Sequence, residues 1–124
     1  MKLKYLLFGV ALVSLTSFSN DNLDTKYIKV TKKITAIFQI LDGEKLIAKS
    51  DCVGCHKLDK KLVGPSYLDI AKKYPMNDKS IAYLSGKIIK GGSGVWGSIP
   101  MPSHASLKKN DANSMVKYIL SLKK

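Results

Sequence analysis

Hydrophobic residues recur at intervals of three and four through residues 43–124, a spacing typical of short amphipathic helices. The first predicted helix is capped by Asp42 and runs toward two cysteines. The second spans residues 65–74, and the third is capped by Asn77 or Asp78 and ends at the glycine pair 91–92. No strand pattern is evident after residue 42, so we expect an all-α domain. The fourth predicted helix has one apolar face, made of Ala112, Met115, Val116 and Ile119.

Residues 91–110, GGSGVWGSIPMPSHASLKKN, carry no regular pattern of apolar positions. Long irregular loops inside a compact domain usually have a function of their own. The final helix follows in the sequence SLKKND, which lacks a clear hydroxyl cap. A helical domain of this size buries too little surface to be comfortably stable alone, so we expect another component to fill its core.

The N-terminal third differs from the rest of the chain. Residues 1–19 combine two lysines, a mostly apolar stretch at 6–18 and small residues for cleavage, which predicts a signal peptide. An uncleaved anchor is the alternative, although a spanning helix needs about 20 apolar residues. Residues 20–42 form an N-terminal extension with helix-like spacing, but their β-branched residues leave a strand open. The predicted domain is therefore 43–124, and either interpretation takes it out of the cytoplasm.

The chain is strongly basic, with 21 Lys+Arg against 9 Asp+Glu and a formal net charge of +12. Every one of these basic residues is a lysine. Proteins that read bases and phosphates favour arginine, because its planar fork makes two hydrogen bonds at once. We therefore expect no nucleic-acid partner, and a basic surface that attracts acidic proteins instead.

Both cysteines of the chain lie in the stretch SDCVGCHKL, and His56 directly follows the second of them. Cys-x-x-Cys-His is the attachment signature of c-type haem. One helical turn brings Cys52 and Cys55 to one side, where their thiols add to the two vinyl groups of the porphyrin. His56 then reaches the iron from the same face. The motif predicts one haem c, bound covalently through Cys52 and Cys55.

Four other uses of these cysteines fit the sequence less well. A thioredoxin-type redox pair requires a βαβ setting, whereas the surroundings here are helical. A structural zinc site needs four ligands, and although the cysteines and histidines of the chain number four, the adjacent Cys55 and His56 are awkward partners in one tetrahedron with Cys52 and His104. A catalytic cysteine needs a base and an orienting group, and no such set stands out. A plain disulfide in an exported chain leaves the adjacent histidine without a role.

The sixth position of the haem iron separates an electron carrier, which has a second protein ligand there, from a catalyst or gas sensor, which leaves it open. Met101 is the candidate ligand, because prolines on both sides fix its backbone. Met115 falls on the apolar face of the last helix and Met76 falls in a turn. We expect His104 at the surface, with replacement of Met101 as the alternative.

These stretches resemble the small bacterial monohaem class I cytochromes c. The similarity covers about residues 43–124 and rests on Cys-x-x-Cys-His, Gly-Pro-x-Tyr, Gly-Val-Trp-Gly and Pro-Met-Pro, in the family's order and spacing. The resemblance implies an all-α class I cytochrome c fold, about four short helices wrapped around one haem, with the first and last helices crossing. It implies His56 and Met101 as axial ligands, and Cys52 and Cys55 as thioether links.

Three further residues take roles from the same resemblance. The carbonyl of Pro65 accepts a hydrogen bond from the His56 ring, which fixes the orientation of the ring. Trp96 donates its indole N–H to a haem propionate, with simple packing as the alternative. Lys87 stands where the family often has a basic partner for a propionate. The family also often places an asparagine after the Pro-Met-Pro turn, where this chain has Ser103-His104.

The expected function is an exported, periplasmic carrier of single electrons between respiratory redox partners, with no small-molecule substrate and no enzymatic activity. One alternative is an accessory subunit of a larger oxidase or reductase, docked through residues 20–41, and the membrane is reached only through such a complex or an uncleaved signal. Another is a haem enzyme or gas sensor, if Met101 is not a ligand. Lysines near the haem motifs are expected to dock transiently on acidic partners: Lys57, Lys60, Lys61, Lys87 and Lys90.

Overall fold

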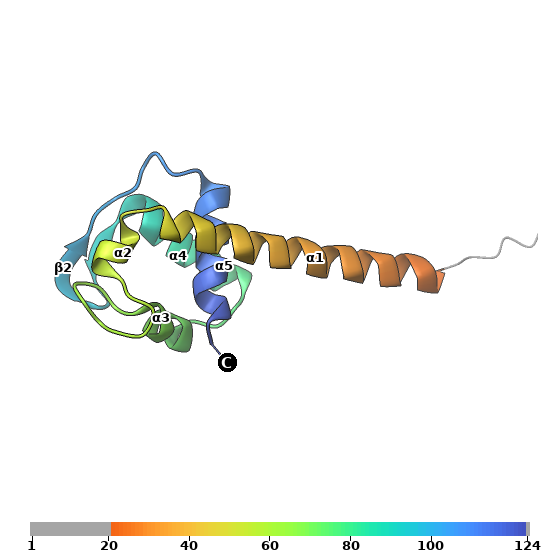
Figure 1. The fold of residues 1–124 in the computed structure, drawn as a ribbon, viewed down its shortest axis with the longest axis horizontal. Coiled ribbons are helices and arrows are strands. Elements are labelled where there is room, and N and C mark those ends of the chain that lie inside the picture. Colours follow the sequence, from red (N-terminus) through yellow and green to blue (C-terminus); the bar gives the residue numbers. More distant parts are fainter. Residues whose placement is uncertain (1–20, 124) are drawn as a thin grey trace, which may run out of the picture.

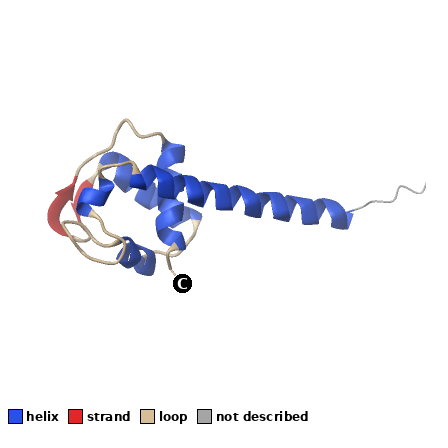
Figure 2. Ribbon diagram, in the orientation of Figure 1, coloured by secondary structure: helices blue, strands red, loops and turns tan. Residues whose placement is uncertain are grey.

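Helices dominate the part of the chain that the structure, a computed structural model, describes, which is residues 21–123. β1 and β2 pair as an antiparallel hairpin. The predicted helical fold is therefore confirmed in outline, while the predicted signal peptide at residues 1–19 lies outside the described residues. In chain order the elements are α1 (Asp21–Ala48), α2 (Cys52–Cys55), α3 (Tyr67–Lys73), α4 (Asp78–Lys90), β1 (Gly92–Gly94), β2 (Gly97–Met101) and α5 (Lys109–Ser121) (Figure 1, Figure 2).

The helix ends follow the capping residues of the sequence. The Ser66 side chain accepts a hydrogen bond from the Asp69 N–H at 3.0 Å, so α3 begins two residues later than the predicted start at residue 65. The Asn77 side chain caps α4 in the same way, at 2.8 Å from the Ser80 nitrogen. α4 ends at Gly91, whose φ of 71° favours glycine. The start of α5 has no side-chain cap, as the sequence predicted.

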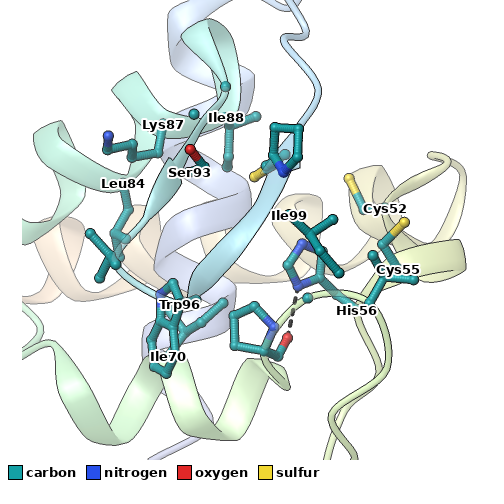
Figure 3. Close-up of a pocket in the computed structure, with 18 of the residues that line it drawn as sticks. Cys52, Cys55, His56, Ile70, Leu84, Lys87, Ile88, Ser93, Trp96 and Ile99 are labelled. Atoms are coloured by element: carbon teal, nitrogen blue, oxygen red, sulfur yellow. Dashed lines mark hydrogen bonds between the residues drawn. The ribbon is translucent and has the colours of Figure 1, made fainter.

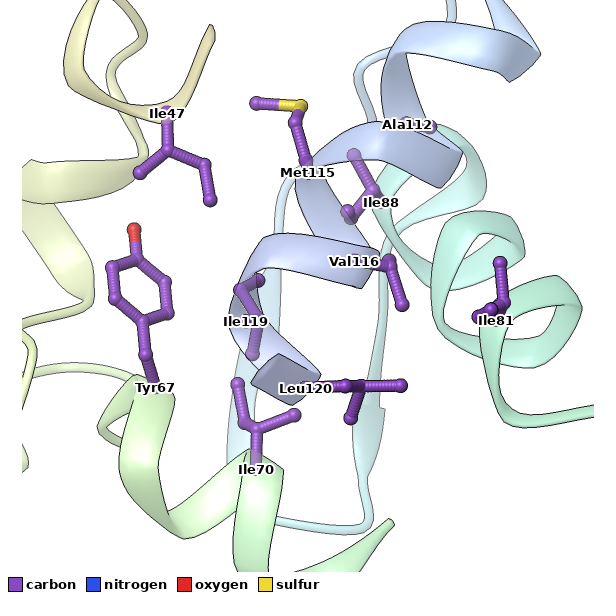
Figure 4. Packing of buried hydrophobic residues seen from close by; sticks show 10 residues of the cluster. All are labelled: Ile47, Tyr67, Ile70, Ile81, Ile88, Ala112, Met115, Val116, Ile119 and Leu120. Carbon is purple, nitrogen blue, oxygen red and sulfur yellow. The ribbon is translucent and has the colours of Figure 1, made fainter. Parts of the chain in front are cut away.

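α5 lies at the centre of the domain and packs against α1, α3 and α4. The crossing of α1 over α5 is close because Gly43 has no side chain: a Cβ there would collide with the main chain of Ser114. The predicted apolar face of α5 is buried in the core of the domain (Figure 4). That core consists of Ile47, Tyr67, Ile70, Ile81, Ile88, Ala112, Met115, Val116, Ile119 and Leu120.

The N-terminal extension is a continuous part of α1, so the predicted helix start after Asp42 is wrong. α1 begins at Asp21 and passes through residue 42 without a break, and only its C-terminal part contacts the rest of the domain closely (Figure 1). The helix-like spacing of residues 27–41 therefore outweighs their β-branched composition. Among the described helices, none combines the length and the apolar character needed to cross a membrane.

The hairpin corrects a second expectation, because residues 91–110 were expected to be irregular. β1 and β2 pair Gly92 with Met101 and Gly94 with Gly97. Glycines 92, 94 and 97 all have positive φ. Because glycine has no side chain, the segment lacks the alternating side chains of an ordinary strand. The hairpin ends at Met101, so its register sets the position of the predicted ligand.

Candidate functional site

A cavity of about 370 Å³ opens among the helices and the hairpin (Figure 3). Its volume falls in the range of small-molecule and cofactor sites, and its walls are mainly apolar. Residues from every element line it, although α1 contributes only Ile47. The cavity brings together all seven predicted site residues: Cys52, Cys55, His56, Pro65, Lys87, Trp96 and Met101.

The two cysteines are held by a single helical turn, α2. The His56 N–H donates to the Cys52 carbonyl at 2.9 Å, which closes this turn, and His56 itself is extended. The thiols of Cys52 and Cys55 form no disulfide and are partly buried. Figure 3 shows both sulfur atoms beside His56 at one side of the cavity. This arrangement suits two covalent bonds to one planar group that the histidine also approaches.

The His56 ring is fixed by the chain that follows it. Its Nδ1 lies 2.7 Å from the Pro65 carbonyl oxygen, as predicted. A carbonyl can only accept, so Nδ1 carries the proton and donates, which leaves the lone pair of Nε2 for a metal. The Tyr67 ring stacks against the imidazole at a centroid distance of 5.8 Å. His56 therefore has the tautomer and the orientation that an axial ligand needs.

Gly64 approaches the same ring, and this leads to a testable prediction. A Cβ at position 64 would lie 2.8 Å from His56 Nδ1, so Gly64→Ala displaces the ring or the loop. We expect the holoprotein to lose about 1–3 kcal/mol of unfolding free energy and to change its reduction potential. Denaturant unfolding and redox titration measure both quantities. Gly54→Ala, whose Cβ meets nothing within 4 Å, is the control, and equal effects of the two variants would contradict the role of Gly64.

Met101 reaches the cavity from the end of β2. The path of the chain there depends on Gly91, because a Cβ at position 91 would lie 2.5 Å from the Met101 carbonyl oxygen. Met115 also lines the cavity, but it is 2% exposed and belongs to the core, as the sequence predicted. Met76 is exposed and is not among the lining residues. Among the three methionines that the structure describes, Met101 therefore is the one that combines a place on the cavity wall with partial exposure.

Trp96 and Lys87 also lie on the wall of the cavity. Trp96 is partly exposed, and the Lys73 ammonium sits 4.6 Å from the centre of its ring. The Lys87 ammonium lies 5.6 Å from the centre of the Tyr83 ring. Both predicted propionate partners are thus on the cavity wall, and their proposed roles as donors stay predictions.

His104 is partly buried rather than on an open surface. Its backbone N–H donates to the Ile88 carbonyl at 3.1 Å, and its Nδ1 lies 3.3 Å from the same oxygen. Its Nε2 lies 3.1 Å from a carboxylate oxygen of Asp51, just before the cysteine motif. Both ring nitrogens of His104 therefore contact other groups, the Ile88 carbonyl and the Asp51 carboxylate, and neither is paired with Met101. Sequence reasoning missed Asp51 and Ile88, since no local motif links them to His104.

Tyr67, the tyrosine of the Gly-Pro-x-Tyr motif, has a buried hydroxyl to which the sequence analysis assigned no role. Burial raises the pKa of this phenol well above its ordinary value, and the nearby Cys52 and Tyr118 raise it further. Its oxygen has no hydrogen-bond partner among the described residues. Buried hydroxyl groups normally have a hydrogen-bond partner, so a lone one at the wall of a cavity fits a cavity that holds another chemical group.

The paired thiols, the oriented imidazole and the apolar cavity define a c-type haem protein. The family model for cytochrome c matches residues 40–123, and the chain belongs to the cytochrome c family. One haem c, bound covalently through Cys52 and Cys55, is its cofactor. The cavity walls, the free thiols and the unpartnered Tyr67 hydroxyl all fit that group.

Curated relatives and solved structures agree with this assignment. The chain is 48% identical to cytochrome c-552 of Hydrogenobacter thermophilus over 65% of this chain and 82% of the relative. It is 46% identical to cytochrome c-552 of Nitrosomonas europaea over 63% of this chain and 76% of the relative. The crystal structure of the wild-type Nitrosomonas europaea cytochrome c552 superimposes with a TM-score of 0.60 at 45% identity, covering 64% of this chain and 99% of that one. The resemblance to small bacterial class I cytochromes c is therefore confirmed.

Proposed function

We propose that this protein is an exported carrier of single electrons whose haem iron is held by His56 and Met101. The observation that carries the proposal is that an imidazole with its Nδ1 already bonded and a methionine thioether line the same apolar cavity as the two thiols. The haem, when bound, supplies an iron that alternates between the ferrous and ferric states. No bond is made or broken in a substrate, so the protein is not an enzyme.

The residues around the cavity suit this role. Pro65 holds the histidine in one tautomer, so ligation costs little reorganisation on a change of oxidation state. A soft thioether favours ferrous iron and raises the reduction potential. The apolar walls keep water from the site. Val95, Trp96 and Ile99 are exposed at the rim, where an electron can enter or leave.

Optical spectra of the mature protein, oxidised and reduced, test the proposal. Covalent haem together with the weak long-wavelength band of thioether-bound ferric iron supports the carrier. Rapid binding of carbon monoxide to the reduced protein would instead support an enzyme or gas sensor with an open sixth position. Co-purification with a larger complex, lost on deletion of residues 20–41, would support the accessory subunit. Periplasmic location is part of the proposal, and fractionation of the source cells tests it.

Docking on acidic redox partners leads to a further prediction. Lys61 and Lys87 line the cavity, and three more lysines near it are exposed: Lys57, Lys60 and Lys90. We expect the second-order rate of electron transfer to an acidic partner to fall about tenfold between low and physiological ionic strength. Lys61→Glu should slow the reaction at low salt, whereas Lys32→Glu, on the distant part of α1, should change it much less. A rate that is indifferent to ionic strength would contradict this docking mode.

A further inference from the structure

The N-terminal part of α1 carries an apolar stripe that no described element covers. Tyr27, Val30, Ile34, Ile37 and Leu41 follow one another at intervals of three and four residues, so they share one face of the helix. We call these five residues the outer stripe. Their side chains are 45% to 65% exposed, and Phe38 beside them is 61% exposed. A contiguous apolar surface of this kind on a small basic protein marks an interaction site.

The outer stripe points away from the domain. Gly43 and Ile47 mark the face of α1 that packs on α5 and the cavity. At 3.6 residues per turn, Ile34 lies about half a turn around the helix axis from Gly43. Figure 1 shows this part of α1 extending beyond the globular domain. A flat surface can therefore approach the stripe without meeting the rest of the protein.

The charged residues beside the outer stripe indicate which kind of partner binds it. Residues 25–41 contain four lysines, at positions 26, 29, 32 and 33, and no acidic residue. Lys26 and Lys33 each precede a stripe residue by four positions, so they border it. Two copies of the chain, each with a formal charge of +12, would bring these lysines together, and the stripe spans only about two heptads. The charge therefore disfavours a second copy and favours an anionic surface.

We propose that the outer stripe of α1 binds the surface of an anionic lipid bilayer. The apolar residues enter the boundary between headgroups and acyl chains, while the bordering lysines contact anionic headgroups. The lysines within residues 25–41 make α1 an interfacial helix that lies along the bilayer.

This contact leaves the haem cavity accessible. Ile47 is the one α1 residue on the cavity wall, and it belongs to the opposite, core-facing side of the helix. A carrier held through α1 therefore searches for redox partners along the membrane surface while its haem edge stays free. Membrane binding by α1 does not depend on Met101 as a ligand, so this proposal and the proposed electron-carrier function can be disproved independently of each other.

Sedimentation of the mature holoprotein with vesicles tests the proposal. The vesicles contain either phosphatidylglycerol with phosphatidylcholine or phosphatidylcholine alone. We expect at least tenfold tighter binding to the anionic vesicles, reduced by salt. Ile34→Asp, at the centre of the stripe, should weaken that binding about tenfold. Thr35→Asp makes the same change of charge on a different, exposed face and should weaken it less than threefold. Unchanged haem spectra establish that both variants are folded.

Three results would overturn the proposal. The first is an absence of binding to anionic vesicles. The second is equal loss of binding in Ile34→Asp and Thr35→Asp, which would show that charge alone, and not the stripe, makes the contact. The third is a dimer in sedimentation velocity that Ile34→Asp dissociates, which would assign the stripe to a second copy of the chain.

Discussion

Replacing Met101 with alanine is expected to abolish the long-wavelength band of the ferric protein and to lower its reduction potential by on the order of 100 mV or more. The thioether is a soft ligand that favours ferrous iron, so its loss stabilises the ferric state relative to the ferrous state. The variant should also bind carbon monoxide rapidly when reduced, because the sixth position opens. Redox titration and stopped-flow mixing measure these changes.

Met115→Leu is the matched control for this experiment. Met115 also lines the cavity, but its side chain is packed in the core, and leucine conserves its volume. The control should keep the band and most of the potential. If the band survived in Met101→Ala and vanished in Met115→Leu, the ligand assignment would be wrong. If the wild-type protein lacked the band, the enzyme or gas-sensor interpretation would replace the carrier.

The parts of the site that the sequence predicted are those whose chemistry demands a fixed local spacing. Cys52, Cys55 and His56 must lie within one turn to meet the same porphyrin, so five adjacent letters suffice. The hydrogen bond from His56 to Pro65 followed from the resemblance, and it spans only nine residues. Capping at Asn77 likewise depends on local bonds. Features that depend on residues close together in the chain can therefore be predicted from a single sequence.

Contacts between distant segments were not predictable in this way. His104 meets Asp51 across 53 residues, and nothing in either segment specifies the other. The hairpin escaped detection because its glycine-rich strands carry no alternating apolar side chains. The start of α1 was misplaced because Asp42 is a good capping residue in isolation. In the fold, the close packing of Gly43 on α5 occurs in the middle of a continuous helix.

Without covalently bound haem, the polypeptide is expected to lack a stable fold. In Cys52→Ala, Cys55→Ala no thioether can form, so the cavity that α3, α4, α5 and the hairpin surround has no permanent occupant. All strand residues except Met101 are exposed, and α2 is a single turn, so the walls cannot close on themselves. The lost core exceeds what a small domain of marginal stability can spare. We expect no cooperative thermal transition and little near-ultraviolet circular dichroism in the purified apoprotein.

Met101→Ala serves as the control for this loss, because it alters the iron ligand and keeps both thioether links. That holoprotein should still unfold cooperatively, at a lower temperature. The comparison separates the two contributions of the cofactor, since one variant removes a ligand bond and the other removes the centre of the core. A cooperative transition in the double cysteine variant would show that the ten buried residues of the core, half of them from α5, are sufficient without haem. The haem would then bind in a preformed cavity, and the fold of this chain would not depend on the cofactor that its function requires.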